Sequence, residues 1–180
     1  MNITTIGRGT IGRGLAKNWQ NAGHEVTLLG RDGGDASHAD VLLIAVPGME
    51  ISPALSGITG LEGKIAIDAT NVLPTRHGEF PSYAHEVQSF TKAPVAKAFN
   101  LNFGRLLGEA AAQRVRPSNW FVADPDARAL AETLITDAGY DPIHLGDLSR
   151  ARSLEDMIWV LLSIEPAENT FYRFAKPGEL

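Results

Sequence analysis

Residues 6–14 read Ile-Gly-Arg-Gly-Thr-Ile-Gly-Arg-Gly and contain the spacing GxGxxG at Gly7, Gly9 and Gly12. A short apolar segment, residues 3–6, precedes this pattern, and a helix-like stretch follows it. Between a strand and a helix, such glycines allow a tight turn, a close approach of the backbone to a pyrophosphate, and close helix–strand packing. The free N–H groups and the positive end of the helix dipole then face the phosphates. The pattern predicts a dinucleotide site; the alternative is a glycine-rich turn without a ligand.

Gly30 and Arg31 follow the second expected strand, residues 25–29. A pocket for NAD usually carries a carboxylate at this point, which binds the ribose hydroxyls. A guanidinium instead donates two parallel charge-assisted hydrogen bonds to a phosphate. We therefore predict that the site prefers NADP, with Arg31 at the 2′-phosphate. Asp32 or Asp35 would weaken this preference by turning inward, and the alternative for Arg31 is a solvated turn residue.

The composition is that of one ordinary globular domain. The 180 residues are 44% hydrophobic and 21% charged, with a formal net charge of −5 that argues against a non-specific nucleic-acid binder. The absence of cysteine excludes disulfides, zinc–thiolate sites and thiol nucleophiles. The longest strongly apolar stretches, residues 41–47 and 157–164, fall short of the roughly 20 residues that span a bilayer. With no basic-then-apolar leader before the first strand, we expect a cytoplasmic protein.

Strands alternate with helices along the chain, which predicts an α/β fold: a Rossmann-like, doubly wound, mostly parallel sheet. The further expected strands are residues 39–46, 64–68, 94–99, 120–123 and 140–145. The expected helices are residues 10–22, 53–58, 83–90, 125–138 with Asp124 as N-cap, and a last helix from Ser149 or Ser153 that runs through 157–164 and resumes over 170–174. Only residues 31–38 separate the second strand from the next. We therefore predict that the usual third strand is deleted and that the adenosine pocket is open.

The expected strand ends, residues 45–47, 69–71 and 99–101, should line one crevice with the glycine turn. They supply small, apolar and amide side chains and no catalytic triad. We interpret Lys97 as a structural or solvent-edge lysine rather than a proton donor. We interpret His77 and His85, with Glu79 and Glu86, as surface residues rather than a metal site, and we predict no metal and no catalytic side chain. Reduction of a carbonyl or imine normally needs a proton donor, whereas hydride exchange between two cofactors needs only stacked rings and exclusion of water.

Further motifs extend this pattern along nearly the whole chain. They are Ile6-Gly7-x-Gly9-x-x-Gly12, Gly30-Arg31, Ala39-Asp40-Val41 through Ala45-Val46-Pro47, Asp68-Ala69-Thr70-Asn71-x-Leu73-Pro74, Lys97-Ala98-Phe99-Asn100, Leu148-Ser149-x-x-Arg152-x-x-Glu155, Arg173-Phe174 and Gly178-Glu179-Leu180. In their order and spacing they resemble the family of NADP-dependent oxidoreductases of the deazaflavin coenzyme F-420.

The resemblance implies that NADP lies along the sheet edge, that the deazaflavin lies over the nicotinamide, and that hydride passes directly between them. It places Val46, Pro47 and Asn71 at the nicotinamide. The complete predicted cofactor site is Gly7, Arg8, Gly9, Thr10, Ile11, Gly12, Arg31, Ala45, Val46, Pro47 and Asn71. The residues expected at the second ring system are Leu73, Asn100 and Leu101.

Two other functions remain open: an NADPH-dependent reductase of a small carbonyl or quinone, and a non-catalytic NADP sensor. For the assembly, we treat residues 1–180 as a single NADP-binding domain that ends in a helical tail, residues 149–180. Residues 157–164 are apolar nearly all round a helix, whereas a helix on a sheet needs only one apolar stripe. The excess predicts a homodimer through this helix; the alternative is burial under residues 169–180.

Overall fold

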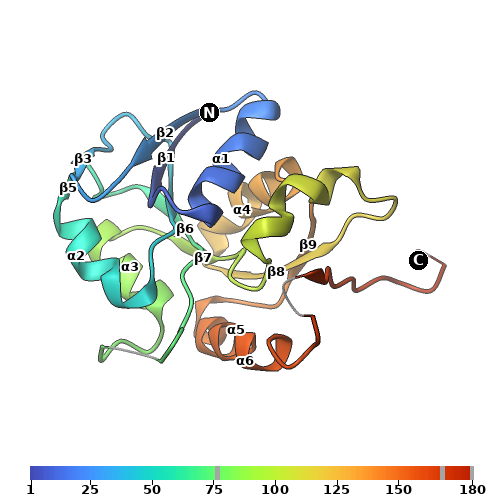
Figure 1. Ribbon diagram of the computed structural model, residues 1–180. Coiled ribbons are helices and arrows are strands. Elements are labelled where there is room, and N and C mark those ends of the chain that lie inside the picture. Colours follow the sequence, from blue (N-terminus) through green and yellow to red (C-terminus); the bar gives the residue numbers. More distant parts are fainter. Residues whose placement is uncertain (76–77, 167–168, 179–180) are drawn as a thin grey trace.

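The computed structural model describes residues 1–75, 78–166 and 169–178, and within them seven strands form one sheet (Figure 1). The strand order is β2-β1-β4-β6-β7-β8-β9. The bounds are β1 (Asn2–Ile6), β2 (Glu25–Leu29), β4 (Val41–Ile44), β6 (Ile65–Asp68), β7 (Val95–Lys97), β8 (Ser118–Ala123) and β9 (Asp141–His144). Neighbouring strands are parallel except β7 and β8, which are antiparallel. The predicted Rossmann-like, mostly parallel sheet is therefore confirmed.

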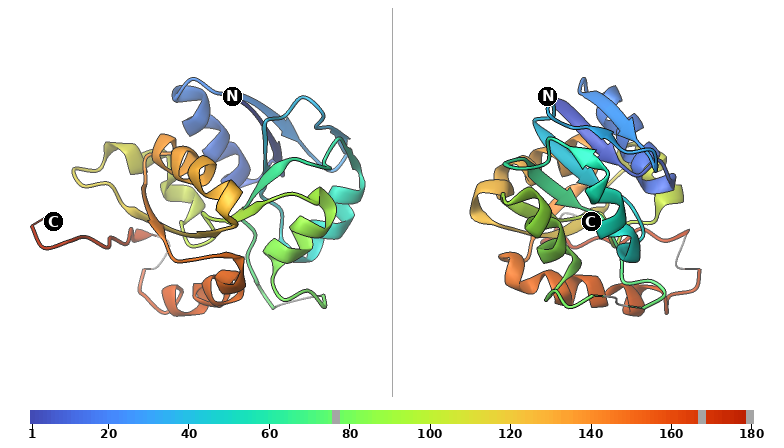
Figure 2. Two further views of the ribbon diagram at one scale, coloured as in Figure 1. Left: turned by 180° about the vertical axis from the view of Figure 1, so that it is seen from behind. Right: turned by 90° about the vertical axis from the view of Figure 1, so that its left-hand side faces the viewer.

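Helices cover both faces of this sheet (Figure 2). One face carries α1 (Thr10–Asn21), α4 (Pro125–Asp137) and the 3-10 segment η2 (Gly104–Ala112); the other carries α2 (Ile51–Ser56), α3 (Tyr83–Thr91), α5 (Ala151–Asp156) and α6 (Ile158–Leu161). Two short 3-10 turns, η1 (Gly48–Glu50) and η3 (Leu148–Arg150), precede α2 and α5. Strand β4 shows why its sequence is a continuous apolar run: Leu42 and Ile44 pack into one core, and Val41 and Leu43 into the other.

The predicted deletion of a third strand is confirmed, because β2 is the edge of the sheet. The residues that follow it form only a tight turn and β3 (Gly34–Asp35), which pairs with β5 (Ile58–Thr59) outside the main sheet. The loop is held by polar contacts from β5 and from the residue that precedes β6. Thr59 Oγ1 donates to Asp35 at 2.9 Å, and Lys64 Nζ donates to the carbonyls of Ser37 and Ala39 at 2.8 and 2.7 Å.

The last helix is shorter and more broken than expected. It divides at Met157 into α5 and α6, and α6 ends at Leu161, so Leu162 and Ile164 lie beyond it. Residues 170–174 are not helical, so that expectation was wrong. The reason lies in how β8 is paired. Strand β7 pairs only with Val122 and Ala123 at the end of β8, so the edge at the start of β8 is left for the tail to bind.

The tail runs along this free part of β8. The backbone N–H of Ser118 donates to the carbonyl of Tyr172 at 2.9 Å, and the N–H of Phe174 donates to Ser118 Oγ at 2.9 Å. The ring of Trp120 meets the rings of Tyr172 and Phe174 at centroid distances of 5.1 and 4.7 Å. The tail therefore extends the packing of β8.

Asp124 occupies the predicted N-cap of α4, but its side chain does not cap the helix. Its carboxylate accepts hydrogen bonds from the backbone N–H of Val95 at 2.9 Å and from Gln88 Nε2 at 2.7 Å. It therefore joins α3 to the amino end of β7. Strand β2 has the predicted ends, and the other predicted elements are found with shifted ends; α2, for example, begins two residues early, and Ile58 belongs to β5. No helix in the described part of the chain has the length and apolar character needed to cross a membrane.

Tyr140 gives a stability prediction. Its side chain is fully buried, its ring meets the edge of Phe99, and no described group bonds its hydroxyl. We expect Tyr140→Phe to raise the free energy of unfolding at pH 7 by about 1 kcal/mol, since an unpaired buried hydroxyl is removed. Burial raises the pKa of Tyr140. Above about pH 10 the unfolded chain loses this proton while the folded chain keeps it, so stability falls by up to about 1.4 kcal/mol per pH unit, a loss that the variant escapes.

Urea unfolding at pH 7 and pH 10.5 measures both effects. Tyr172→Phe is the matched control, because burial also raises the pKa of Tyr172 but its hydroxyl accepts a hydrogen bond from the N–H of Trp120 at 3.3 Å. Tyr172→Phe should have a lower free energy of unfolding than wild type at pH 7. Between pH 7 and pH 10.5 its free energy of unfolding should fall less than that of wild type. A Tyr140→Phe protein less stable than wild type at pH 7 would contradict the prediction.

Candidate functional site

The three glycines of the first turn differ in what surrounds them. Gly7 has φ +114°, and a Cβ on it would lie 2.2 Å from the carbonyl oxygen of Ala45. A Cβ on Gly12 would lie 2.0 Å from the carbonyl oxygen of Gly7, so α1 approaches the turn as closely as backbone allows. Gly9 has φ −77°, and no described atom lies within 4 Å of its Cβ position. The fold itself requires Gly7 and Gly12, whereas Gly9 faces open space.

The amino end of α1 is free to bind an anion. Gly9 is its N-cap, no described side chain caps it, and its first turn holds no acidic residue. The first N–H groups of a helix have no partner within the helix, and the helix dipole favours negative charge there. Arg13, an exposed residue of α1, donates from Nε to the carbonyl of Arg8 at 2.7 Å and so closes the glycine turn.

A pocket of about 830 Å³ opens in front of this turn, at the carboxyl ends of β1, β2 and β4. Open α/β sheets bind their ligands at this edge. The lining residues are Ile6, Gly7, Arg8, Gly9, Gly30, Arg31, Asp32, Ala45, Val46, Pro47, Met49, Glu50, Pro53 and Ala54. Seven of them were predicted: Gly7, Arg8, Gly9, Arg31, Ala45, Val46 and Pro47. The sequence reasoning missed the wall formed by η1 and α2. Its only local signal was the Pro47-Gly48 turn after a buried strand.

Two arginines and one aspartate meet at the β2 end of the pocket. The bridge between Gly30 and Gly33 makes a tight turn with Arg31 and Asp32 at its tip. Asp32, suspected of neutralising Arg31, instead pairs with Arg8, with Nη2 and Oδ2 3.3 Å apart. The Arg8 guanidinium lies against Gly30, where a Cβ would be 2.0 Å from Nη2. This ion pair is exposed, and such pairs contribute only about 0–1 kcal/mol, so a phosphate can compete for Arg8.

The other predicted contact residues lie outside the lining of this pocket. Thr10, Ile11 and Gly12 form the first turn of α1 behind the glycine loop. Asn71 and Asn100 do meet: Asn71 Nδ2 donates to the Asn100 carbonyl at 2.5 Å, and Asn100 Nδ2 donates to the Leu154 carbonyl at 3.2 Å. Leu73 is exposed, whereas Leu101 is buried in the core on the face of the sheet that carries α2, α3, α5 and α6.

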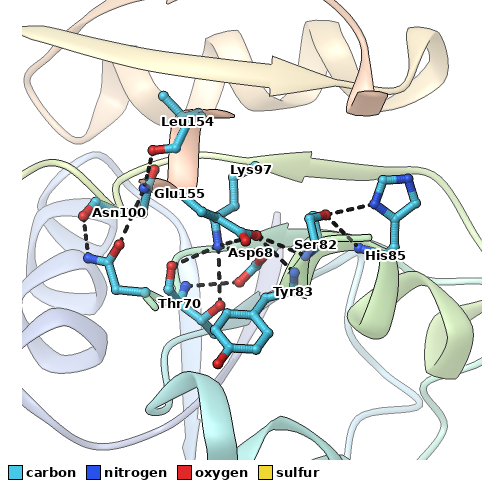
Figure 3. A network of polar contacts seen from close by, with 11 residues as sticks. Asp68, Thr70, Ser82, Tyr83, His85, Lys97, Asn100, Leu154 and Glu155 are labelled. Atoms are coloured by element: carbon cyan, nitrogen blue, oxygen red, sulfur yellow. Dashed lines mark hydrogen bonds and ion pairs between the residues drawn. The ribbon is translucent and has the colours of Figure 1, made fainter. Parts of the chain in front are cut away.

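Lys97 corrects part of our interpretation, because it is structural but nowhere near solvent. Its side chain is 0% exposed, as are those of its partners Asp68 and Glu155 (Figure 3). Its Nζ lies 2.7 Å from Asp68 Oδ2, 3.3 Å from Glu155 Oε1 and 2.7 Å from the Thr70 carbonyl. Strand β7 lies inside the sheet and α5 covers its end, so the ammonium is enclosed. Burial raises the pKa of Asp68, and the Glu155 charge adds to this rise while Lys97 opposes it.

Among the remaining polar candidates, Glu79 is exposed as expected, His85 is half-buried, and Glu86 is buried, so the prediction that Glu86 lies at the surface was wrong. His85 Nδ1 lies 2.7 Å from Ser82 Oγ at the start of α3, and Glu86 accepts a hydrogen bond from Ser52 Oγ at 2.6 Å. His77 lies outside the described residues. No group of three or more histidine or acidic side chains that could hold a metal ion occurs in residues 1–75, 78–166 and 169–178.

Comparison with known proteins yields structural relatives only. No protein-family model matches the chain, and no curated protein matches it. A protein from Arthrobacter sp. FB24, proposed to be an F420-dependent NADP reductase, is 24% identical with a TM-score of 0.80, over 98% of this chain and 100% of that one. A hypothetical protein from Sinorhizobium meliloti is 23% identical with a TM-score of 0.67, over 84% and 88%.

A reductive aminase from Aspergillus terreus, solved with NADPH and ethyl-5-oxohexanoate, is 16% identical with a TM-score of 0.65. The match covers 90% of this chain and 60% of that larger chain. Identities this low establish the fold that these proteins share. They leave the activity to be argued from the site.

The glycine turn gives a second prediction. We expect Gly9→Ala to lower the free energy of unfolding by no more than about 0.5–1 kcal/mol, the cost of an alanine at the N-cap, because its backbone is ordinary and its Cβ meets open space. Gly12→Ala should lose about 1–3 kcal/mol through overpacking against Gly7. Urea unfolding of both variants without ligand measures the difference. Equal losses would show that Gly9 is held for the fold and not for a ligand.

Proposed function

We propose that this protein is an NADP-dependent oxidoreductase. The observation that carries the proposal is the convergence in one pocket of an uncapped helix N-terminus and the guanidinium groups of Arg8 and Arg31. The helix end suits a pyrophosphate, and the arginines suit the additional phosphate on the adenosine ribose. The fold shared with a reductase solved with NADPH supports this reading.

Dinucleotide orientation follows from where the charges lie. The basic end of the pocket is at β2, so the adenosine half belongs there. The nicotinamide half then extends past β4, whose end and the turn after it supply the apolar residues Ala45, Val46, Pro47 and Met49. We propose that Asn71 and Asn100, at the ends of β6 and β7, border the ring and that Leu73 lies beside the second substrate.

NADPH bound in this orientation would supply a hydride. Apart from the exposed Glu50 of η1, the residues around the proposed ring position are apolar or carry amides, and Lys97 is enclosed with its two carboxylates. We therefore propose that the chain binds and orients the two reacting ring systems and excludes water from them. No side chain transfers a proton in this proposal. This suits a deazaflavin or flavin-like acceptor, which takes the hydride directly. The resemblance to deazaflavin-dependent oxidoreductases and the fold of the Arthrobacter protein support this class of acceptor.

A second candidate is an NADPH-dependent reductase of a small carbonyl or imine. The fold likeness to the reductive aminase favours it, although that enzyme is longer than this chain. Turnover separates the possibilities. NADPH absorbance should fall when a deazaflavin or flavin is added if the first proposal holds, and only with a ketone, imine or quinone if the second does. Binding of NADPH without turnover of any acceptor would indicate a sensor.

Arg31 gives the prediction for cofactor choice. Hydrogen bonds to a charged partner contribute about 1.5–3 kcal/mol each, and about 1.4 kcal/mol is tenfold in affinity. Arg31→Ala should therefore weaken NADP binding by about 10–100-fold and leave NAD binding nearly unchanged. Gly30→Asp should weaken NADP further, because its carboxylate displaces Arg8 and repels the phosphate. Arg128→Ala, on the exposed face of α4, is the control.

Calorimetric titration of both nucleotides measures these affinities. A wild-type protein that prefers NAD, or equal losses of NAD and NADP binding in Arg31→Ala, would contradict the assignment of Arg31.

We also propose that the protein forms a homodimer through the C-terminal segment around α6. Ile158 and Leu161 pack into the core, whereas Trp159 and Val160 are 47% and 61% exposed, with Leu162 and Ile164 exposed beside them. A contiguous apolar surface of this kind marks an interaction site, and a second copy of the same surface is the simplest cover. Light scattering at micromolar concentration should give a dimer mass for wild type and for the control Ala129→Glu, and a monomer mass for Val160→Glu. A monomeric wild type would refute the dimer.

A further inference from the structure

The buried Lys97 network joins parts of the chain that meet at the carboxyl edge of the sheet (Figure 3). Lys97 ends β7 and Asp68 ends β6, and the two residues are direct partners in the parallel register. Glu155 comes from α5, and its Oε1 accepts hydrogen bonds from the N–H groups of Tyr83 at 2.9 Å and Ala84 at 3.4 Å, at the start of α3. One cation and two carboxylates thus fix two strand ends and two helices relative to one another.

Thr70 is held by this network at every polar atom. Its N–H donates to Asp68 Oδ1 at 2.9 Å, its carbonyl accepts from Lys97 Nζ at 2.7 Å, and its Oγ1 lies 3.2 Å from the same nitrogen. The backbone that leads into the next residue, Asn71, is therefore fixed in position. Its amide is held in turn by Asn100, which donates to the carbonyl of Leu154, the residue before Glu155.

The network also supports the wall of the pocket. Gly48 follows the lining residue Pro47, and a Cβ on Gly48 would lie 2.1 Å from Tyr83 Cε2 and 2.7 Å from the Asn71 carbonyl oxygen. The turn after β4 therefore rests directly on Asn71 and Tyr83. Both are held by the network, Asn71 through Thr70 and Tyr83 through Glu155.

We propose that Lys97 and Glu155 are positioning residues for the nicotinamide half of the bound dinucleotide. They act through Thr70, Asn71 and Tyr83 on the turn at Pro47 and Gly48, and they lie at the ends of β6 and β7 and on α5, whereas Arg8 and Arg31 lie at the β2 end of the pocket. This inference rests on the proposed NADP site and adds that α5, a C-terminal element, sets the geometry of its reactive half.

Two ligands separate this role from general stability. NADP occupies both halves of the site, whereas adenosine 2′,5′-bisphosphate occupies the adenosine half alone. Glu155→Gln removes the charge and keeps an oxygen for the N–H of Tyr83, and Thr70→Val is a milder change that removes only the hydroxyl. Asp124→Asn is the matched control, because Asp124 also links α3 to β7 but at the amino end of the strand.

Calorimetric titration at a temperature where each variant is folded, as checked by circular dichroism, gives both affinities. We expect Glu155→Gln to weaken NADP by about tenfold or more, since small displacements in a site are costly, with the bisphosphate affinity unchanged within about twofold. Thr70→Val should also lose affinity for NADP alone, by a smaller factor. If Glu155→Gln does not fold, the Thr70→Val result decides the question. The control should lose neither affinity.

Equal loss of both ligands in folded Glu155→Gln or Thr70→Val, or no loss of either, would overturn the positioning role. A wild-type protein that binds neither ligand would instead overturn the proposed function.

Discussion

The Lys97 ammonium cannot be buried without partners, and much of the carboxyl edge of the sheet is arranged by that requirement. The register of β6 against β7 sets Asp68 beside it, and a slip of one residue would turn Lys97 to the opposite face, among the apolar residues beneath α1 and α4. Glu155 completes the set from a helix more than fifty residues further along the chain. Removing Lys97 would leave two buried carboxylates without a cation, and removing either carboxylate would leave buried N–H donors without their acceptor, so the strand ends and α5 are interdependent.

Two carboxylates around one ammonium would carry an excess negative charge if all three were ionised. The structure offsets it in two ways. Glu155 accepts from backbone N–H groups at the start of α3, where the helix dipole is positive. Asp68, which lacks a helix end, is the group whose pKa burial raises, with the Glu155 charge adding to the rise. The amino end of α3 is thus used to hold a protein carboxylate, while the amino end of α1 is left without one.

The parts predicted from the sequence are those that local chemistry decides. The glycine spacing, the apolar run of β4 and the short connection after β2 each carry a local signal, and together they define the sheet, its missing third strand and half of the pocket lining. The parts missed depend on contacts between distant segments. The enclosure of Lys97 needs Glu155, the α2 wall needs α2 to pack over the sheet edge, and the path of the tail needs the free start of β8. Asp124 shows the same limit at one residue: its place was predicted, but its partners Gln88 and Val95 were not.

The end of β2 shows how one small residue couples two features of the pocket. Gly30 is the position where an NAD site would carry a carboxylate, and it is also the place against which the Arg8 guanidinium lies. A side chain there would occupy the volume of the Arg8 head group. The glycine at position 30 therefore accounts both for the missing carboxylate and for the presence of the Arg8 guanidinium beside Arg31. In the described part of the chain no third strand covers this edge, and the exposed pair of Arg8 and Asp32 lies at the opening of the pocket beside the turn. Charge at this end is therefore set by Gly30 as much as by Arg31, and the proposed preference for a phosphate depends on both residues.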